Sequence, residues 1–246
     1  MEPTPATPNP YAQADPDLYH RVRPGYPEAA LEALLTRVGP VRSVADIGAG
    51  TGIFARQLLD LEPQVRVEAV EPAPEMPRGA PTQPRLTWHR GTSEATGLAP
   101  ASVDLVVWAQ SFHWVDRERT GPEASRILVP GGHGAIIQNQ MEVGEPWVHR
   151  LSRIMRSGDV IRADWNPRLP GFKTRLVQVF PWVQTLTVDE VMALARTRSS
   201  YLGSGPARQR RMQANLNWYL RDHLAYPKEG QVRIPHLTFL WILDPA

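Results

Sequence analysis

The chain has 246 residues, 42% of them hydrophobic, enough to bury the core of one α/β domain with additions. Its formal net charge is +2, and it has no cysteine, which excludes disulfides, thiolate metal sites and a cysteine nucleophile. No apolar run approaches the ~18 residues that a membrane span needs, and no secretory signal opens the chain. We therefore expect a soluble, cytoplasmic protein that needs no metal.

The N-terminal stretch divides into a leader and a cap. Residues 1–10 contain four prolines and almost nothing to bury, which predicts a disordered leader. Residues 11–38 are predicted to form an N-terminal cap. It runs from Tyr11 to Arg23, through the Pro24-Gly25-Tyr26-Pro27 segment, into an amphipathic helix with its apolar face on Leu31, Leu34, Leu35 and Val38.

A glycine turn follows the first predicted strand. Val44–Ile47 reads as a buried strand that contains Asp46, and Gly48, Gly50 and Gly52 follow at alternate positions. A helical pattern begins at Ile53. A strand, a glycine turn and a helix together bring a polar ligand against backbone N–H groups. A dinucleotide fingerprint needs its third glycine where Ile53 stands, so the spacing disfavours a nicotinamide-dependent oxidoreductase. The absence of an obvious Tyr-x-x-x-Lys pair disfavours it further.

Four more strands are predicted up to about residue 140. They are Val65–Glu71, Leu86–Gly91, Val103–Gln110 and, after a turn at Ile127–Gly132, Gly134–Gln138. Between the first and second of these four strands lies a segment rich in proline, residues 72–84. Proline is tolerated in the first turn of a helix and not in its interior, so this segment predicts a shortened or abolished helix.

The pattern changes in the last hundred residues. Residues 146–163 read as helical, 164–174 as a loop and 176–188 as a strand. Asp189 is the expected cap of a short helix, and another helix is expected over 206–224. Leu237–Leu243 is predicted to be the final strand.

These landmarks resemble those of a known family. The D-x-G-x-G-x-G pattern over Asp46–Gly52 resembles motif I of class I S-adenosylmethionine (SAM) dependent methyltransferases, and the later strands follow in that family's order. Tyr19–Pro27 resembles the Y-x-x-x-R-P-x-Y-P segment of its type 11, small-molecule subgroup, which includes trans-aconitate methyltransferase-like enzymes. The Ala-Gln-x-x-His-Trp run at 109–114 resembles a feature of the same subgroup.

The resemblance implies an α/β fold with a Rossmann-like sheet of seven strands in the order 3-2-1-4-5-7-6, the last strand antiparallel. It implies one methyltransferase domain over 11–246. Within it we expect the cap at 11–38, a cofactor-binding core at 40–140, a lid with insertions at 141–225 and a terminal strand at 226–246.

The resemblance also implies a set of cofactor-binding residues for SAM. Asp46 would face the methionine amino group and Glu71, after the second strand, would accept hydrogen bonds from the ribose. The other expected contacts come from the glycine turn, the adenine pocket, the end of the fourth strand and the cap: Gly48, Ala49, Gly50, Gly52, Pro72, Met76, Thr92, Ser93, Gln110, Tyr19 and Arg23. Many relatives carry a carboxylate where Thr92 stands.

The implied reaction is direct in-line methyl transfer to an acceptor, which makes a small molecule the expected partner. His113 is the general-base candidate by position. The subgroup keeps the His-Trp pair with different acceptors, so a structural role for His113 also stays open. DNA amino-methyltransferases carry an N/D-P-P-Y/F motif where this chain has Gln110–His113. That difference, and an arginine-rich stretch without interleaved aromatics at 196–211, argue against nucleic acid as a partner. The oligomeric state is left undetermined.

One alternative function stays open. The prolines of 72–84 and the missing carboxylate at Thr92 also suit a protein that binds SAM and transfers no methyl group, acting as a binding or regulatory module.

Overall fold

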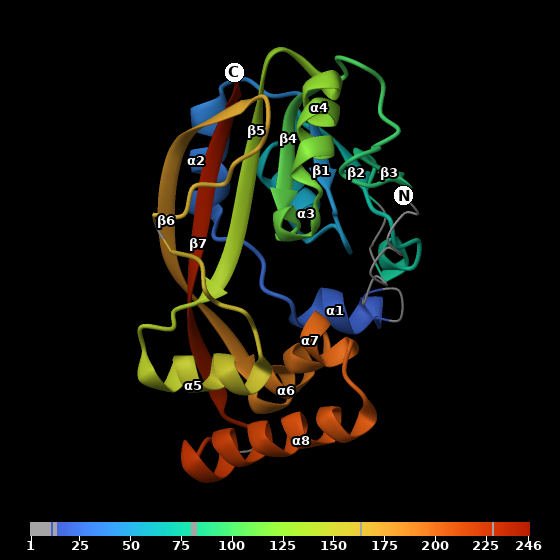
Figure 1. Ribbon diagram of the computed structural model, residues 1–246. Coiled ribbons are helices and arrows are strands. Elements are labelled where there is room, and N and C mark those ends of the chain that lie inside the picture. Colours follow the sequence, from blue (N-terminus) through green and yellow to red (C-terminus); the bar gives the residue numbers. More distant parts are fainter. Residues whose placement is uncertain (1–10, 12–13, 80–82, 163, 228) are drawn as a thin grey trace.

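The computed structural model describes residues 11, 14–79, 83–162, 164–227 and 229–246 (Figure 1). The predicted leader at 1–10 lies outside this part of the chain. The described residues form one sheet of seven strands in the order β3-β2-β1-β4-β5-β7-β6, which confirms the predicted order. In chain order these strands are β1 (Ser43–Ile47), β2 (Arg66–Val70), β3 (Leu86–His89), β4 (Val103–Ala109), β5 (Leu128–Met141), β6 (Phe172–Thr187) and β7 (Gln231–Pro245).

The strands from β1 to β5 are parallel, and β7 runs antiparallel between β5 and β6. All five residues of β1 are buried. Such unbroken burial is typical of a central parallel strand that is covered on both faces. The last strand in the chain, β7, is antiparallel to both of its neighbours, as expected.

Helices cover the two faces of the sheet. Helices α2 (Glu28–Val38) and α3 (Ile53–Leu61) pack on the face that carries Val44, and α4 (Arg117–Ile127) packs on the face that carries the next residue, Ala45. Because successive side chains of a strand point to opposite faces, one short apolar strand contributes to both layers.

A third core lies beyond the carboxyl ends of the parallel strands. Figure 1 shows a group of helices there, below the arrowheads of β4 and β5. Buried side chains such as Val22, Leu151, Leu194 and Ile234 fill the space between these helices and the ends of β6 and β7. We call the helices from the C-terminal half of the chain the lid; they are α5 (Pro146–Met155), α6 (Val188–Arg196), α7 (Ser199–Leu202) and α8 (Pro206–Asn217). Helix α1 (Pro16–Val22), which belongs to the predicted cap, packs against them.

The structure differs from the sequence prediction at several element boundaries. The helix expected over 146–163 ends at Met155, because Arg156 and Gly158 adopt left-handed backbone angles, with φ of 53° and 73°. Thr187, and not Asp189, caps α6: its side chain accepts from the backbone N–H of Glu190, whose own carboxylate accepts in return. The helix expected over 206–224 is α8 followed by a π-helical turn at Trp218–His223.

The strand boundaries also differ. The turn expected at Ile127–Gly132 starts with the last residue of α4 and otherwise lies inside β5, where the register against β4 shifts between Val103 and Leu105. The range 141–225, expected to hold the lid, also contains β6, which is the edge strand of the sheet. The proline-rich segment retains a single 3₁₀ turn at Met76–Gly79, in agreement with the loss of a regular helix.

Candidate cofactor-binding site

The site is built where β1, β2 and β4 end side by side. Ligands of open α/β sheets bind at the carboxyl ends of the strands, where neighbouring connections diverge. Here the turn after β1 approaches the end of β4 so closely that a Cβ on Gly48 would lie 2.6 Å from the Cβ of Ser111. The Ser111 hydroxyl donates a short hydrogen bond to the carbonyl of Ile47 and joins the two ends.

The glycine turn needs left-handed backbone at three positions. Gly48, Gly50 and Gly52 have φ of 71°, 58° and 75°, a region that side chains with a Cβ rarely adopt. The space above Gly50 is open: in the described part of the chain, a Cβ there would meet only the Cε of Met76, at 3.6 Å. Gly50 is therefore the position where a ligand can approach the backbone most closely.

The amides of the turn are mostly engaged within the protein. The N–H groups of Gly48 and Ala49 donate to the carbonyl of Val70 at 2.8 and 3.2 Å. The N–H of Gly50 donates to Glu71 at 2.8 Å. The turn thus presents its carbonyls and its bare Cα atoms to a ligand more than its N–H groups.

Glu71 connects the turn to the end of β2. One carboxylate oxygen accepts from the N–H of Gly50 and the other from the N–H of Ala73, at 2.9 Å. Burial raises the pKa of Glu71, while these two hydrogen bonds act in the opposite direction. Each oxygen keeps a further acceptor position, so the carboxylate is fixed and can still accept from two neighbouring hydroxyl groups.

Asp46 is the least compensated group of the site. Its carboxylate is completely buried, and neither oxygen has a hydrogen-bond partner among the described residues. Desolvation and the nearby charge of Glu71 raise the pKa of Asp46 to about 8; the Ala55 amide opposes them without forming a hydrogen bond. A buried acid with no donor is costly, so this position suits a ligand that brings a cationic donor.

The residues expected around adenine are only partly available. Met76 is buried beside the turn, whereas Pro72 and Thr92 are exposed. The hydroxyl of Ser93 accepts from the indole N–H of Trp108 at 2.9 Å and from the hydroxyl of Thr120 at 3.1 Å. The Ser93 side chain is thereby held against β4, which the sequence did not reveal.

Gln110 lies at the end of β4 in a strained conformation. Its φ is 58°, unusual for a residue with a Cβ, and such strain is found preferentially at functional sites. Its side-chain amide donates to the carbonyl of Asn139 at 2.9 Å. The Asn139 side chain donates in turn to the carbonyl of Gly25 at 2.7 Å, so it links the strand end to the cap.

Sequence reasoning missed Gln57 and Asn139, which hold the cap over the site. Gln57 on α3 accepts from the N–H of Tyr26 at 2.8 Å and donates to the Tyr26 carbonyl at 2.9 Å. His20 on α1 lies 3.3 Å from the Thr51 hydroxyl in the glycine turn, and α1 also packs against the Met76–Gly79 turn. No sequence motif marks these contacts, because each joins residues that are far apart in the chain.

Tyr19 and Arg23 bring the cap toward the carboxyl end of β4, which we call the mouth of β4. The Arg23 guanidinium lies 4.7 Å from the centre of the Tyr19 ring and donates to the carbonyl of Thr197 at 2.8 Å. His113 lies in a 3₁₀ turn, Phe112–Trp114, with its ring centre 5.0 Å from that of Trp114. Desolvation lowers the pKa of His113, and the charge of Arg23 acts in the same direction, although part of the ring stays exposed.

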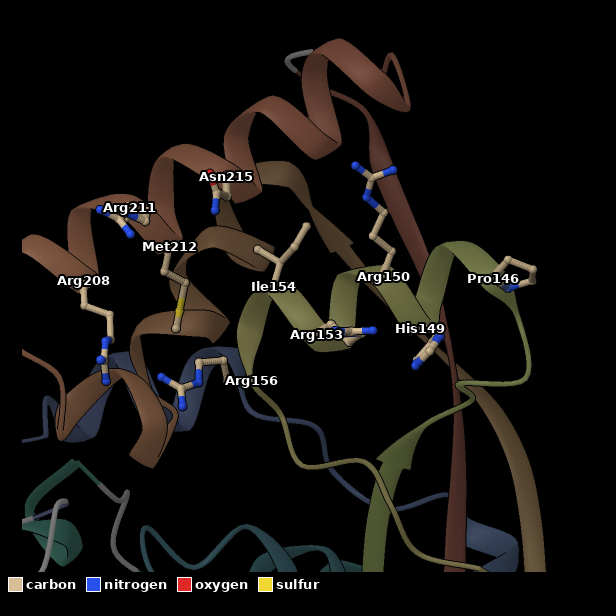
Figure 2. A pocket seen from close by; sticks show the side chains of 10 residues that line it. All are labelled: Pro146, His149, Arg150, Arg153, Ile154, Arg156, Arg208, Arg211, Met212 and Asn215. Carbon is tan, nitrogen blue, oxygen red and sulfur yellow. The ribbon is translucent and has the colours of Figure 1, made fainter.

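A hollow of about 580 Å³ lies elsewhere, between α5 and α8 (Figure 2). It is lined by Pro146, His149, Arg150, Arg153, Ile154, Arg156, Arg208, Arg211, Met212 and Asn215. Its five arginines are exposed to solvent. Figure 1 shows α8, which forms one wall of the hollow, on the side of the lid that faces away from the sheet. It is therefore separate from the strand ends described above. Within the described residues, no group of three or more histidines, aspartates or glutamates is arranged to hold a metal, and no helix is long and apolar enough to cross a membrane.

Comparison with known proteins agrees with the geometry. Residues 45–136 match a methyltransferase domain family. An uncharacterized methyltransferase of Mycobacterium tuberculosis is 35% identical over 225 residues, which are 89% of this chain and 89% of that protein. The trans-aconitate 2-methyltransferase of Azoarcus sp. is 36% identical over 179 residues, 70% of this chain and 66% of that enzyme.

A solved structure described as a type II methyltransferase from Anaeromyxobacter dehalogenans superimposes with a TM-score of 0.65 at 26% identity, covering 89% of this chain and 97% of its own. The chain belongs to the class I SAM-dependent methyltransferases. SAM is accordingly its cofactor. The residues present fit that cofactor, because SAM carries an ammonium group for the unpartnered Asp46 and a ribose diol for Glu71.

Proposed function

We propose that this methyltransferase acts on a small-molecule acceptor. The observation that carries the proposal is the enclosure of the mouth of β4: α1 covers the glycine turn, and Arg23 on the cap reaches the carbonyl of Thr197 in the lid. A mouth closed from two sides leaves room for a compact acceptor and not for a duplex or a folded protein. The similarity to a trans-aconitate 2-methyltransferase supports the same size of acceptor.

The cofactor residues divide the work of binding. Asp46 would accept from the ammonium group of SAM, and Glu71 would accept from the ribose hydroxyls while the amides of Gly50 and Ala73 hold it in place. Met76 would pack on the adenine, and Gly50 would allow the ligand to lie against bare backbone. Gln110 fixes the strand end that faces the methionine portion.

When bound, SAM supplies an activated methyl group on a sulfonium, whose leaving group needs no further activation. The protein then has to position an acceptor and exclude water, and positioning of this kind is worth up to ~7–11 kcal/mol. Trp114, which is 53% exposed, and Tyr11, whose ring centre lies 6.4 Å away, stand at the entrance and can exclude water there. His113 stays neutral near pH 7 because its pKa is lowered, which allows it to accept a proton if the acceptor carries one.

The test is isotopic. The protein is incubated with methyl-labelled SAM and a metabolite extract, and the labelled product is separated by size and identified. We expect label in a small organic compound. Label confined to nucleic acid or protein would overturn the small-molecule proposal, and saturable SAM binding with no labelled product would favour a protein that only binds the cofactor.

A further inference from the structure

Two arginines differ from all those around the hollow of Figure 2. The arginines there project into solvent, which compensates their charge. Arg23 and Arg198 are instead only partly exposed, and each has a buried Nε without a hydrogen-bond partner among the described residues. A positive charge that is removed from water and not paired requires an explanation.

Arg198 is the N-cap residue of α7, and its Nε is buried. Its backbone lies beside the end of α1, because Arg23, which follows α1, donates to the carbonyl of the preceding residue, Thr197. Desolvation, with Arg23 acting in the same direction, lowers the pKa of Arg198 to about 10, so it remains protonated at neutral pH. Arg198 follows Thr197, whose carbonyl accepts from Arg23, and the charge of Arg23 contributes to the lower pKa of Arg198, so we treat the two guanidinium groups as one cluster.

No acid of the described chain neutralises Arg198. Asp159 is the acidic group that affects it, but the Asp159 carboxylate accepts from the N–H of Met141 at 3.1 Å and from the Ser152 hydroxyl at 2.6 Å. No ion pair joins Asp159 to Arg198 within the described residues. His236, buried nearby on β7, stays neutral because burial chiefly lowers its pKa to about 4, and the charge of Arg198 acts in the same direction.

More unused polar groups face the same side of β6. The indole N–H of Trp182 and the side-chain carbonyl of Gln184 have no partner among the described residues. They belong to this region because the Gln184 amide donates to the carbonyl of Val22 at 3.1 Å and the Trp182 ring lies 5.0 Å from that of His236. One donor, the Trp182 indole, and one acceptor, the Gln184 carbonyl, therefore lack partners among the described residues on the face of β6 where Gln184 contacts the end of α1.

We propose that Arg198 binds a carboxylate group of the methyl acceptor, so that the natural acceptor is a small organic acid. This inference rests on the proposed transfer to a small molecule and narrows its class. A guanidinium presents parallel N–H donors that match the two oxygens of a carboxylate. Arg23 is the arginine that the family resemblance assigns to the cofactor, and Arg198 is the cation that remains for the acceptor.

The test measures binding without turnover. The protein is saturated with S-adenosylhomocysteine (SAH), and succinate and propane-1,2,3-tricarboxylate are titrated by calorimetry at constant ionic strength. We expect at least one of them to bind the wild type, and we expect Arg198→Gln to lose about 10–100-fold in affinity, the value of one charge-assisted pair. Arg198→Lys should recover part of this loss, because the charge returns without the planar fork.

Arg196→Gln is the matched control, since Arg196 is exposed at the end of α6 and loses the same charge. It should leave both affinities unchanged. SAH affinity and melting temperature are measured for every variant, so a misfolded protein is recognised. If Arg198→Gln proves unstable, Arg198→Lys and the titration of the wild type with neutral succinamide, which should not bind, carry the test.

Each outcome separates this inference from the proposal on which it rests. Failure of SAH to bind would overturn the cofactor assignment. Normal SAH binding with no affinity for either acid, or with equal affinity in Arg198→Gln, would overturn the carboxylate site and leave the small-molecule proposal standing. Stronger binding of glycerol phosphate than of the two acids would assign Arg198 to phosphate instead. A loss of SAH affinity alone would assign Arg198 to the cofactor.

Discussion

The two regions that flank the strand ends hold ionisable groups of opposite kind. Around the glycine turn, Asp46 and Glu71 are buried acids, and Asp46 has no donor in the described residues. Under the lid, Arg23 and Arg198 are bases with unpartnered Nε atoms. A cationic group of the cofactor would satisfy the turn, and an anionic group of the acceptor would satisfy the lid. The difference agrees with the proposal that two ligands complete the site: the cofactor at the acidic end and an acid at the basic end.

The largest expected effect concerns the glycine turn. Gly50→Val should abolish SAH binding, with a loss of at least about 100-fold, because the branched side chain fills the open space and resists a φ of 58°. Gly39→Val is the matched control: Gly39 has a φ of 79°, and a Cβ there meets no described atom within 4 Å. It should show the backbone strain as a lower melting temperature and keep SAH affinity. Equal SAH affinity in both variants would remove the turn from the site.

Glu71→Ala should have the next largest effect. We expect a loss of about 2–4 kcal/mol in SAH binding, from one or two charge-assisted hydrogen bonds. Because Glu71 also accepts from the amides of Gly50 and Ala73, the variant should melt at a lower temperature as well. Glu68→Ala, on the same strand, loses only part-exposed pairs with His89 and Arg66 and should bind SAH normally. Calorimetry and thermal melting distinguish the two; unchanged SAH affinity in Glu71→Ala would disprove the ribose contact.

The acidic region predicts a specific pH dependence for the ligand-free protein. Asp46 has a folded pKa of about 8 against 3.8 in its ordinary state, so between these values the folded protein holds a proton that the unfolded chain has released. Asp46 therefore makes stability fall as pH rises through this window, by up to about 1.4 kcal/mol per unit.

Asp46→Asn should remove that contribution. The variant should gain melting temperature relative to the wild type as pH rises from about 5 to about 8, and it should bind SAH more weakly. Asp60→Asn, at an exposed position of α3, is the control and should follow the wild-type pH profile. If the melting temperatures of Asp46→Asn and the wild type differed by the same amount at every pH, the buried, uncompensated carboxylate would be contradicted.

The smallest expected effect belongs to His113. General-base catalysis contributes about 10²–10⁴-fold, and we expect His113→Gln to lower the rate at saturating SAM by less than tenfold. The His113 ring packs on Trp114, so the change should appear mainly as a lower melting temperature. A loss of 100-fold or more with normal stability and normal SAH affinity would show that His113 is the base.

The positions near the glycine turn were predictable because their geometry is local. Asp46, Gly48 and Gly50 follow a buried strand within a few residues, and left-handed turns need glycine whatever surrounds them. The strand order was predictable from the family pattern, and the effect of the prolines in 72–84 follows from the missing N–H and the fixed φ of proline.

Sequence reasoning was less successful where a side chain has a choice of partners. The sequence did not show that the Ser93 hydroxyl accepts from Trp108 and Thr120, and its expected contact with adenine stays a prediction. Asp189 was expected to cap α6, yet Thr187 does so, because the capping box with Glu190 satisfies two donors at once. Thr187 and Asp189 are both compatible with the local sequence as the cap of α6, so packing decides between them.

The sequence by itself determined the class of protein, the parallel core and the acidic glycine turn, since these depend on hydrophobic periodicity and on the backbone preferences of a few adjacent residues. Only the tertiary structure decided that Arg23 and Arg198 lie in one cluster with no ion-paired acid among the described residues, and that Gln57 and Asn139 hold the cap over the site. The physical reason is distance along the chain. Charges and amides that are far apart in the sequence have no preferred partner until the sheet and the lid have packed, and only then does burial leave a group without a counterpart.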